Sequence, residues 1–124
     1  MGIHGELAEL VGRAGDDVLR DAADFRAAFD DFVSEGAASE GELNLLTDAI
    51  RLGALERVVA QVGNGAEASR AIELQAGRLA EQRGTEEVRG PRWALAVLCF
   101  ALGLVGEEAV LAAGRGEAAP PPIT

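Results

Sequence analysis

The apolar residues of this chain recur at intervals of three and four positions in almost every segment. That spacing places them on one side of an α-helix, whereas a half-buried strand would need apolar residues at every second position. The periodicity therefore predicts an all-α protein. With 124 residues, of which 48% are hydrophobic, the chain is long and apolar enough to form one compact bundle of about six helices.

Three helices are expected in the N-terminal half. The first covers residues 4–14, and the second is capped by Asp21 and runs to about residue 34. The third begins after Ser39, because Ser39 and Glu42 have the spacing of a capping box, in which each side chain accepts a hydrogen bond from the backbone N–H of the other residue. These segments account for the first half of the bundle.

The second helix has the clearest division into two faces. Its buried side is a stripe of three phenylalanines at i, i+4 and i+7: Phe25, Phe29 and Phe32. Its opposite side carries three aspartates that are expected to face solvent: Asp24, Asp30 and Asp31. In the third helix, Asn44 lies among leucines and is expected to be half buried and hydrogen-bonded to a neighbouring helix.

Three more helices are expected in the C-terminal half. The fourth is short and contains four apolar residues: Leu55, Val58, Val59 and Val62. The turn at 63–65 separates it from the fifth helix, over residues 67–83. Thr85 is expected to cap the sixth. Pro91 either marks the true start of this helix or kinks it, and we favour a kink with a rigid part over residues 91–102, because proline lacks the backbone N–H.

The sixth helix is apolar almost all round, which predicts that the other helices surround it. Trp93 is expected to be a core residue whose indole N–H lies near a carbonyl, in preference to an interface anchor. A weak seventh turn is expected at 107–113. Residues 1–113 are thus predicted to form one domain, and residues 114–124, rich in Pro, Gly and Ala, a flexible tail.

No catalytic residue, metal ligand or cofactor is expected. A single cysteine and a single histidine cannot form a disulfide within the chain, a multi-cysteine metal site or a set of histidine ligands. Cys99 lies within the most apolar segment and is expected to be a core residue, and His4 lies at the other end of the chain. The acidic pairs at 16–17 and 30–31 lack the spacing of a calcium loop, and adjacent helical residues point about 100° apart. An enzyme is therefore not expected.

The net charge of −10 argues against two classes of partner. Nucleic acid and anionic membranes are negatively charged, and the 11 basic residues, all arginine, form no cluster in the sequence. The most apolar stretch, residues 93–105, is shorter than the roughly 20 residues of a membrane span. Without a recognisable signal sequence, and with one unpaired cysteine, the chain is expected to be cytoplasmic.

Several segments carry a resemblance to a known domain: residues 15–21, 25–32, 42–46, 49–50, 92–94 and 101–104, with Gly53. Together they resemble an all-helical bacterial domain that is frequent in actinobacteria, where it is appended to Ser/Thr kinases, chaperone-like ATPases, J-domain proteins and zinc-ribbon proteins. The resemblance covers residues 6–105. It implies a non-catalytic interaction module akin to death-fold-like and effector-associated domains.

We therefore expect a protein–protein interaction or adaptor domain whose acidic surface binds a basic face of its partner, since the apolar residues are consumed by the core. The surface expected to make this contact comprises Asp24, Asp30, Asp31 and Glu35. The alternative is a regulatory or sensory bundle that binds a small apolar ligand between helices. Homotypic association stays open: the net charge opposes it unless four arginines form an opposite patch, namely Arg51, Arg57, Arg70 and Arg78.

Overall fold

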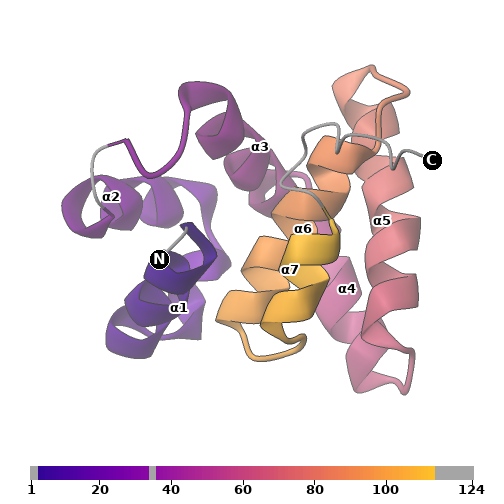
Figure 1. Cartoon of the computed structure of the whole chain (residues 1–124), viewed down its shortest axis with the longest axis horizontal. Coiled ribbons are helices and arrows are strands. Elements are labelled where there is room, and N and C mark those ends of the chain that lie inside the picture. The colour runs from indigo at the N-terminus through magenta and orange to yellow at the C-terminus, as the bar shows by residue number, and fades with distance from the viewer. Residues whose placement is uncertain (1–2, 34–35, 114–124) are drawn as a thin grey trace.

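The computed structural model describes residues 3–33 and 36–113, and its helices pack into a bundle (Figure 1). The described residues form α1 (Ile3–Ala14), a short 3-10 helix η1 (Asp16–Leu19), α2 (Ala22–Phe32), α3 (Glu40–Arg51), α4 (Ala54–Gly63), α5 (Ala68–Arg83), α6 (Arg89–Ala101) and α7 (Glu107–Ala112). The all-α prediction is confirmed for this part of the chain, and the weak seventh turn is the helix α7. The predicted tail, residues 114–124, lies outside the described residues.

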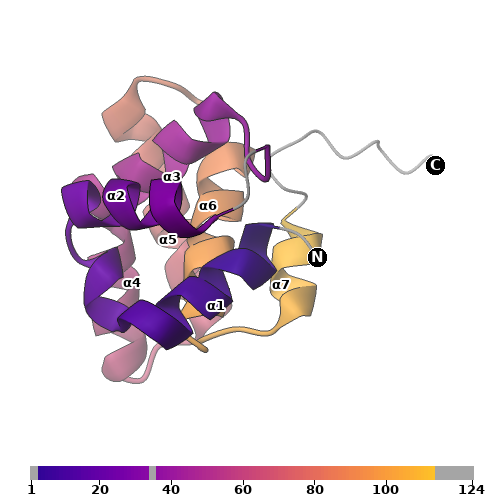
Figure 2. The same cartoon turned by 90° about the vertical axis from the view of Figure 1, so that its left-hand side faces the viewer.

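Helix α6 is the centre of the bundle, as predicted. It packs against α1, α3, α4, α5 and α7, which together enclose it on most sides (Figures 1 and 2). Every residue from Trp93 to Cys99 is buried, and Trp93 is fully enclosed. Because α6 presents apolar side chains all round, it can complete the buried faces of several amphipathic helices at once.

The N-terminal caps of α2 and α3 form as the sequence predicts. The Asp21 side chain accepts a hydrogen bond of 3.0 Å from the backbone N–H of Asp24. At α3, the backbone N–H of Glu42 donates to the Ser39 hydroxyl over 3.1 Å, and the Ser39 N–H donates to the Glu42 carboxylate over 2.9 Å. These bonds satisfy amides that have no partner within the helix, so each helix starts at a defined residue.

Two glycines in the left-handed region set the direction of the chain at the ends of α3 and α6. Gly53 has φ of +85° between α3 and α4, and Gly103 has φ of +81° after α6. The N–H of Leu104 donates back to the carbonyl of Cys99 over 2.8 Å, which closes the end of α6. A side chain at either position would strain the backbone, so glycine is the residue that these turns need.

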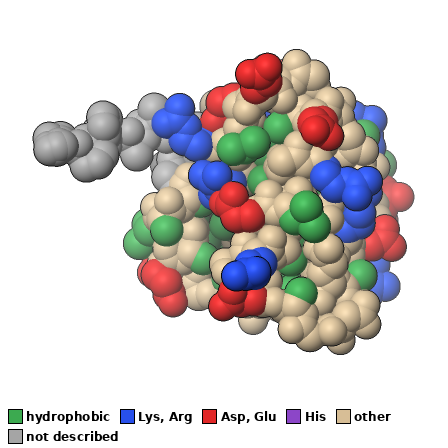
Figure 3. Space-filling model, turned by 90° about the vertical axis from the view of Figure 1, so that its right-hand side faces the viewer, with side chains coloured by type: hydrophobic (Ala, Val, Ile, Leu, Met, Phe, Trp, Pro, Cys, Tyr) green, Lys and Arg blue, Asp and Glu red, His purple; other side chains and the backbone are tan. Residues whose placement is uncertain are grey.

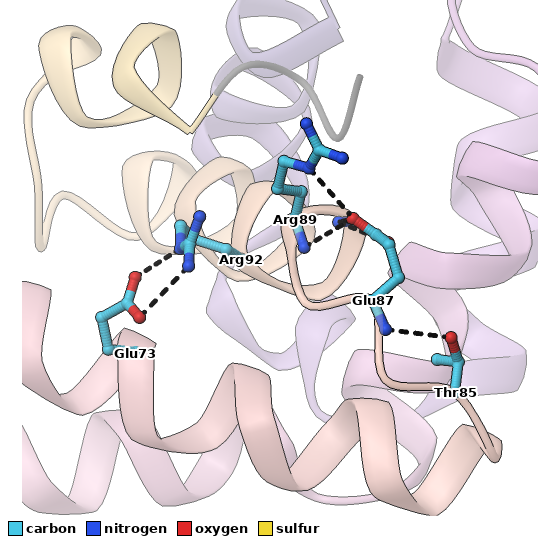
Figure 4. Close-up of polar contacts among 6 residues, drawn as sticks. Glu73, Thr85, Glu87, Arg89 and Arg92 are labelled. Carbon is cyan, nitrogen blue, oxygen red and sulfur yellow. Dashed lines mark hydrogen bonds and ion pairs between the residues drawn. The ribbon is translucent and has the colours of Figure 1, made fainter. Parts of the chain in front are cut away.

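The predicted kink at Pro91 is wrong. Helix α6 begins at Arg89, so Pro91 lies in its first turn, where a backbone N–H would have no partner within the helix. The expected cap by Thr85 is also wrong. The Thr85 hydroxyl accepts from the N–H of Glu87, and the Glu87 carboxylate in turn accepts from the N–H groups of Arg89 (2.8 Å) and Gly90 (3.2 Å) (Figure 4).

Replacing Glu87 with alanine is expected to destabilise the protein by about 1 kcal/mol, because two amides at the start of α6 lose their acceptor. The free energy of unfolding from urea titration measures this. Glu86→Ala is the matched control, since Glu86 is an exposed neighbour in the same turn, and a change within about 0.5 kcal/mol is expected there. Equal losses in the two variants would contradict the role of Glu87 as the cap.

The indole of Trp93 departs from one sequence expectation. Its ring is in the core, as predicted, but its Nε1 is buried and has no hydrogen-bond partner among the described residues. The expected bond to a carbonyl is therefore absent there. A buried donor without an acceptor costs free energy, so the packing of the ring must outweigh that cost.

Candidate functional site

The three aspartates predicted on the outer side of α2 face solvent. Asp24, Asp30 and Asp31 are all exposed, while Phe25 and Phe29 are buried on the other side of the helix. Among the described residues, none of the three carboxylates forms an ion pair. The fourth predicted residue, Glu35, lies outside the described residues.

Charge is distributed unevenly along the chain. Residues 1–50 contain 12 acidic and 3 basic side chains, whereas residues 51–124 contain 9 and 8. The first group forms α1, η1, α2 and α3, and α1 and α2 lie together on one side of the bundle (Figure 1). On the side where α5 lies, basic and acidic side chains are interspersed (Figure 3). The excess negative charge thus belongs to the N-terminal helices.

A cleft of about 480 Å³ lies where η1, α4 and the ends of α3 and α6 meet. In Figure 2, α4 appears behind the segment that joins α1 to α2. The apolar residues that line the cleft are Leu19, Ile50, Leu55, Val59, Ala60, Leu102 and Leu104. Its charged residues are Asp16, Arg20 and Glu56. Sequence analysis missed this site.

Val59 lines the cleft with 41% of its surface exposed. Adjacent residues on a helix point about 100° apart, so Val58 and Val59 cannot both face the same core. Val58 is fully buried. The two adjacent valines were the one sequence signal that pointed to an apolar face on the solvent side of α4.

The charged residues of the cleft are exposed and only loosely paired. Arg20 Nε lies 3.7 Å from Asp17 Oδ1, and both side chains are largely solvated. Such an exposed pair contributes little to stability and is easily rearranged. Asp16 and Glu56 form no ion pair within the described residues. The mouth of the cleft therefore has an excess of negative charge.

Cysteine and histidine often take part in catalysis, but in this protein Cys99 lies in the core and His4 joins two helices. Cys99 is buried, and burial raises the pKa of its thiol from 9.0 to about 12, so the nucleophilic thiolate is scarce at neutral pH. His4 donates from Nε2 to Glu107 Oε2 over 2.8 Å, and its ring meets the edge of Phe100. This contact joins the starts of α1 and α7.

The arginines considered for an opposite basic patch are mostly engaged within the chain. Arg51 donates to Asp48 over 2.9 Å, and Arg57 donates from Nε to the buried Gln75 over 2.7 Å. Arg70 lies 3.8 Å from Glu67. Of these four arginines, Arg78 has neither an ion pair nor a side-chain hydrogen bond among the described residues, whereas Arg57 has hydrogen bonds but no ion pair. They do not create a free basic surface.

Two further polar contacts hold neighbouring helices together. Arg92 of α6 forms an ion pair with Glu73 of α5, to which its Nη2 also donates over 3.3 Å (Figure 4). Arg26 of α2 donates to the amide oxygen of Asn44 on α3 over 3.0 Å. Asn44 bonds to a neighbouring helix as predicted, but it is exposed and not half buried, because it lies on the outer side of α3.

Within residues 3–33 and 36–113, no group of three or more His, Cys, Asp or Glu side chains could hold a metal ion. None of the helices described there has the length and apolar character needed to cross a membrane. The fold and the surface together define a small helical bundle with an acidic side and an apolar cleft. Comparison of the chain with models of known families, with curated proteins and with solved structures found no match.

Proposed function

We propose that this chain is a non-catalytic protein–protein interaction module, an adaptor that binds a basic face of its partner through the acidic surface. That surface comprises Asp24, Asp30 and Asp31 on α2, together with Glu35. The observation that carries the proposal is that three exposed carboxylates, none in an ion pair within the described residues, lie on one helix of 11 residues. The resemblance to helical domains of bacterial signalling proteins supports an adaptor role, and a reducing cytoplasm suits the unpaired Cys99.

The physical basis is electrostatic steering. The large apolar side chains of α2 are used in the core, so its solvent side offers charge as the means of recognition. A negative face raises the rate at which a positive partner surface arrives and disfavours acidic partners. Exposed charges are screened over about 8 Å at physiological ionic strength, so the interaction must weaken as salt is added.

Removing charge from α2 without changing its shape is expected to weaken partner binding by about tenfold, since three carboxylates lose their attraction to a basic face. The variant is Asp24→Asn, Asp30→Asn and Asp31→Asn combined. Proteins captured from a lysate by the native chain are identified, purified and titrated against both forms at about 50 and 300 mM salt. Native binding is expected to fall with salt, and the dependence is expected to be weaker in the variant.

The matched control neutralises three exposed acidic residues elsewhere, so that the net charge changes equally: Glu67→Gln, Glu81→Gln and Glu86→Gln. Its affinity is expected to stay within about twofold of the native value, because the charges removed lie outside the acidic surface. Equal losses in the two triple variants would show that net charge alone matters. That result, or binding indifferent to salt, would contradict the proposal.

A further inference from the structure

The solvent side of α4 carries an apolar strip that is exposed at Val59 and Ala60 and buried at Leu55. Leu55 and Val59 lie one helical turn apart and both line the cleft, with Ala60 beside them. Leu102 and Leu104, only half buried, continue the strip beyond α4. Among residues 3–33 and 36–113, the other large apolar residues that are exposed, Leu74 and Leu111, do not line this cleft.

We propose that this cleft receives the apolar face of a helical segment of a partner protein, a segment that also carries Lys or Arg beside its apolar anchors. The inference rests on the proposed function and names the partner chemistry that would accompany the acidic surface. Helices present anchors at i, i+3, i+4 and i+7, and they commonly bind in apolar grooves through such residues. A partner helix that lies along α4 would place its anchors at the same spacing as Leu55 and Val59.

The size of the cleft fits this occupant. Its volume of about 480 Å³ is that of a pocket able to enclose a small molecule, about 300–1,000 Å³, and it therefore has room for apolar side chains of a partner. The floor is firm, because Leu19, Ile50 and Leu55 are buried and fixed by the core. Val59 is the exposed part, so an incoming side chain would remove its apolar surface from water.

The charged residues at the mouth of the cleft favour particular residues beside the apolar anchors of the partner segment. Asp16 and Glu56 line the cleft, and Arg20 is already partly neutralised by Asp17. Asp21, which caps α2, follows Arg20 directly in the chain and adds a further carboxylate to this segment. A basic residue beside the apolar anchors would therefore meet complementary charge at the mouth of the cleft.

Two other occupants fit less well. A small apolar molecule is usually oriented by a few polar groups inside its pocket, but the charged lining residues here are all exposed to solvent. A second copy of the chain would bring an equally acidic mouth against this one, at a net charge of −10 for each molecule. Complementarity of charge favours a basic partner over both.

The test begins with a display library of helical peptides about four turns long, randomised on one face and selected against the full chain. Enriched peptides are expected to combine apolar residues at helical spacing with Lys or Arg. Their affinity, measured by fluorescence anisotropy, is expected to fall about tenfold for Val59→Asp, because a carboxylate would enter the apolar contact. Leu74→Asp is the matched control, since Leu74 is an exposed apolar residue on α5, and it should bind within about twofold of the native chain.

Circular dichroism of both variants verifies that the fold is retained, as expected for substitutions at exposed positions. Equal binding by the two variants, enriched peptides without basic residues, or a library without binders would each overturn the cleft proposal. Binding of a dye such as anilinonaphthalene sulfonate, or of a second copy of the chain, would also overturn the proposal if Val59→Asp abolished that binding. A different result would contradict the proposed function: native affinity of the captured partner for the variant in which the three aspartates of α2 are replaced by asparagine.

Discussion

Replacing Trp93 with alanine is expected to lower the free energy of unfolding by about 3–5 kcal/mol, the largest effect of any single substitution considered for this protein. Trp93 is fully buried in α6, the helix that packs against five others. Domains of this size have a total stability of about 5–15 kcal/mol, so the variant would be close to unfolding at moderate temperature. Because Trp93 is the only tryptophan, far-ultraviolet circular dichroism must monitor the urea titration.

Trp93→Phe separates ring packing from the buried N–H. Phenylalanine keeps an aromatic ring in the core but removes Nε1, which has no hydrogen-bond partner in the described part of the chain. The loss of packing is then partly offset by removal of an unsatisfied donor, so this variant is expected to lose less than about 2 kcal/mol. A loss below about 1 kcal/mol for Trp93→Ala would contradict the central position of this side chain.

Above pH 9 the protein is expected to lose stability at about 1.4 kcal/mol per pH unit, because of Cys99. Burial raises the pKa of this thiol from 9.0 to about 12. Between these values the unfolded chain releases the thiol proton and the folded chain keeps it, so rising pH favours unfolding. The stabilisation is complete below the unfolded pKa, and about 2–3 kcal/mol of it should be gone by about pH 11.

This chain suits that measurement because it contains no lysine and no tyrosine. Arginine keeps its proton throughout the range, so Cys99 is the only side chain expected to titrate there. Urea titrations at several pH values between about 8 and 11 give the slope, and Cys99→Ala is the control. The alanine variant is expected to be less stable at every pH but to show no slope. An equal slope in both forms would place the titrating group elsewhere.

Local sequence signals predicted the helices and several of their ends. The caps at Asp21 and Ser39 were predictable because each depends on residues three positions apart, independent of the rest of the fold. The start of α6 was not, because Thr85 and Glu87 both offer an acceptor near Pro91, and the path of the chain decides which of them meets the free amides. Because α6 begins at Arg89, with its first amides bound by the Glu87 carboxylate, Pro91 falls in the first turn and needs no kink.

The candidate sites differ in how far sequence could predict them. The aspartates of α2 were placed correctly, because the phenylalanine stripe fixes which side of that helix faces the core. The cleft was out of reach, since it combines η1, α4 and the residues after α6, which are distant in sequence. Only Val59 gave a local hint, through its adjacency to Val58.

The central position of α6 also orders the events of folding during synthesis. Residues 89–101 leave the ribosome after α1 to α5 have been made, and until then α1, α3, α4 and α5 lack the common partner against which they pack. The nascent chain must therefore carry uncovered apolar surface for most of its translation. Cooperative folding awaits the last third of the polypeptide, so a chain that terminates before residue 89 would be a substrate for chaperones and proteases.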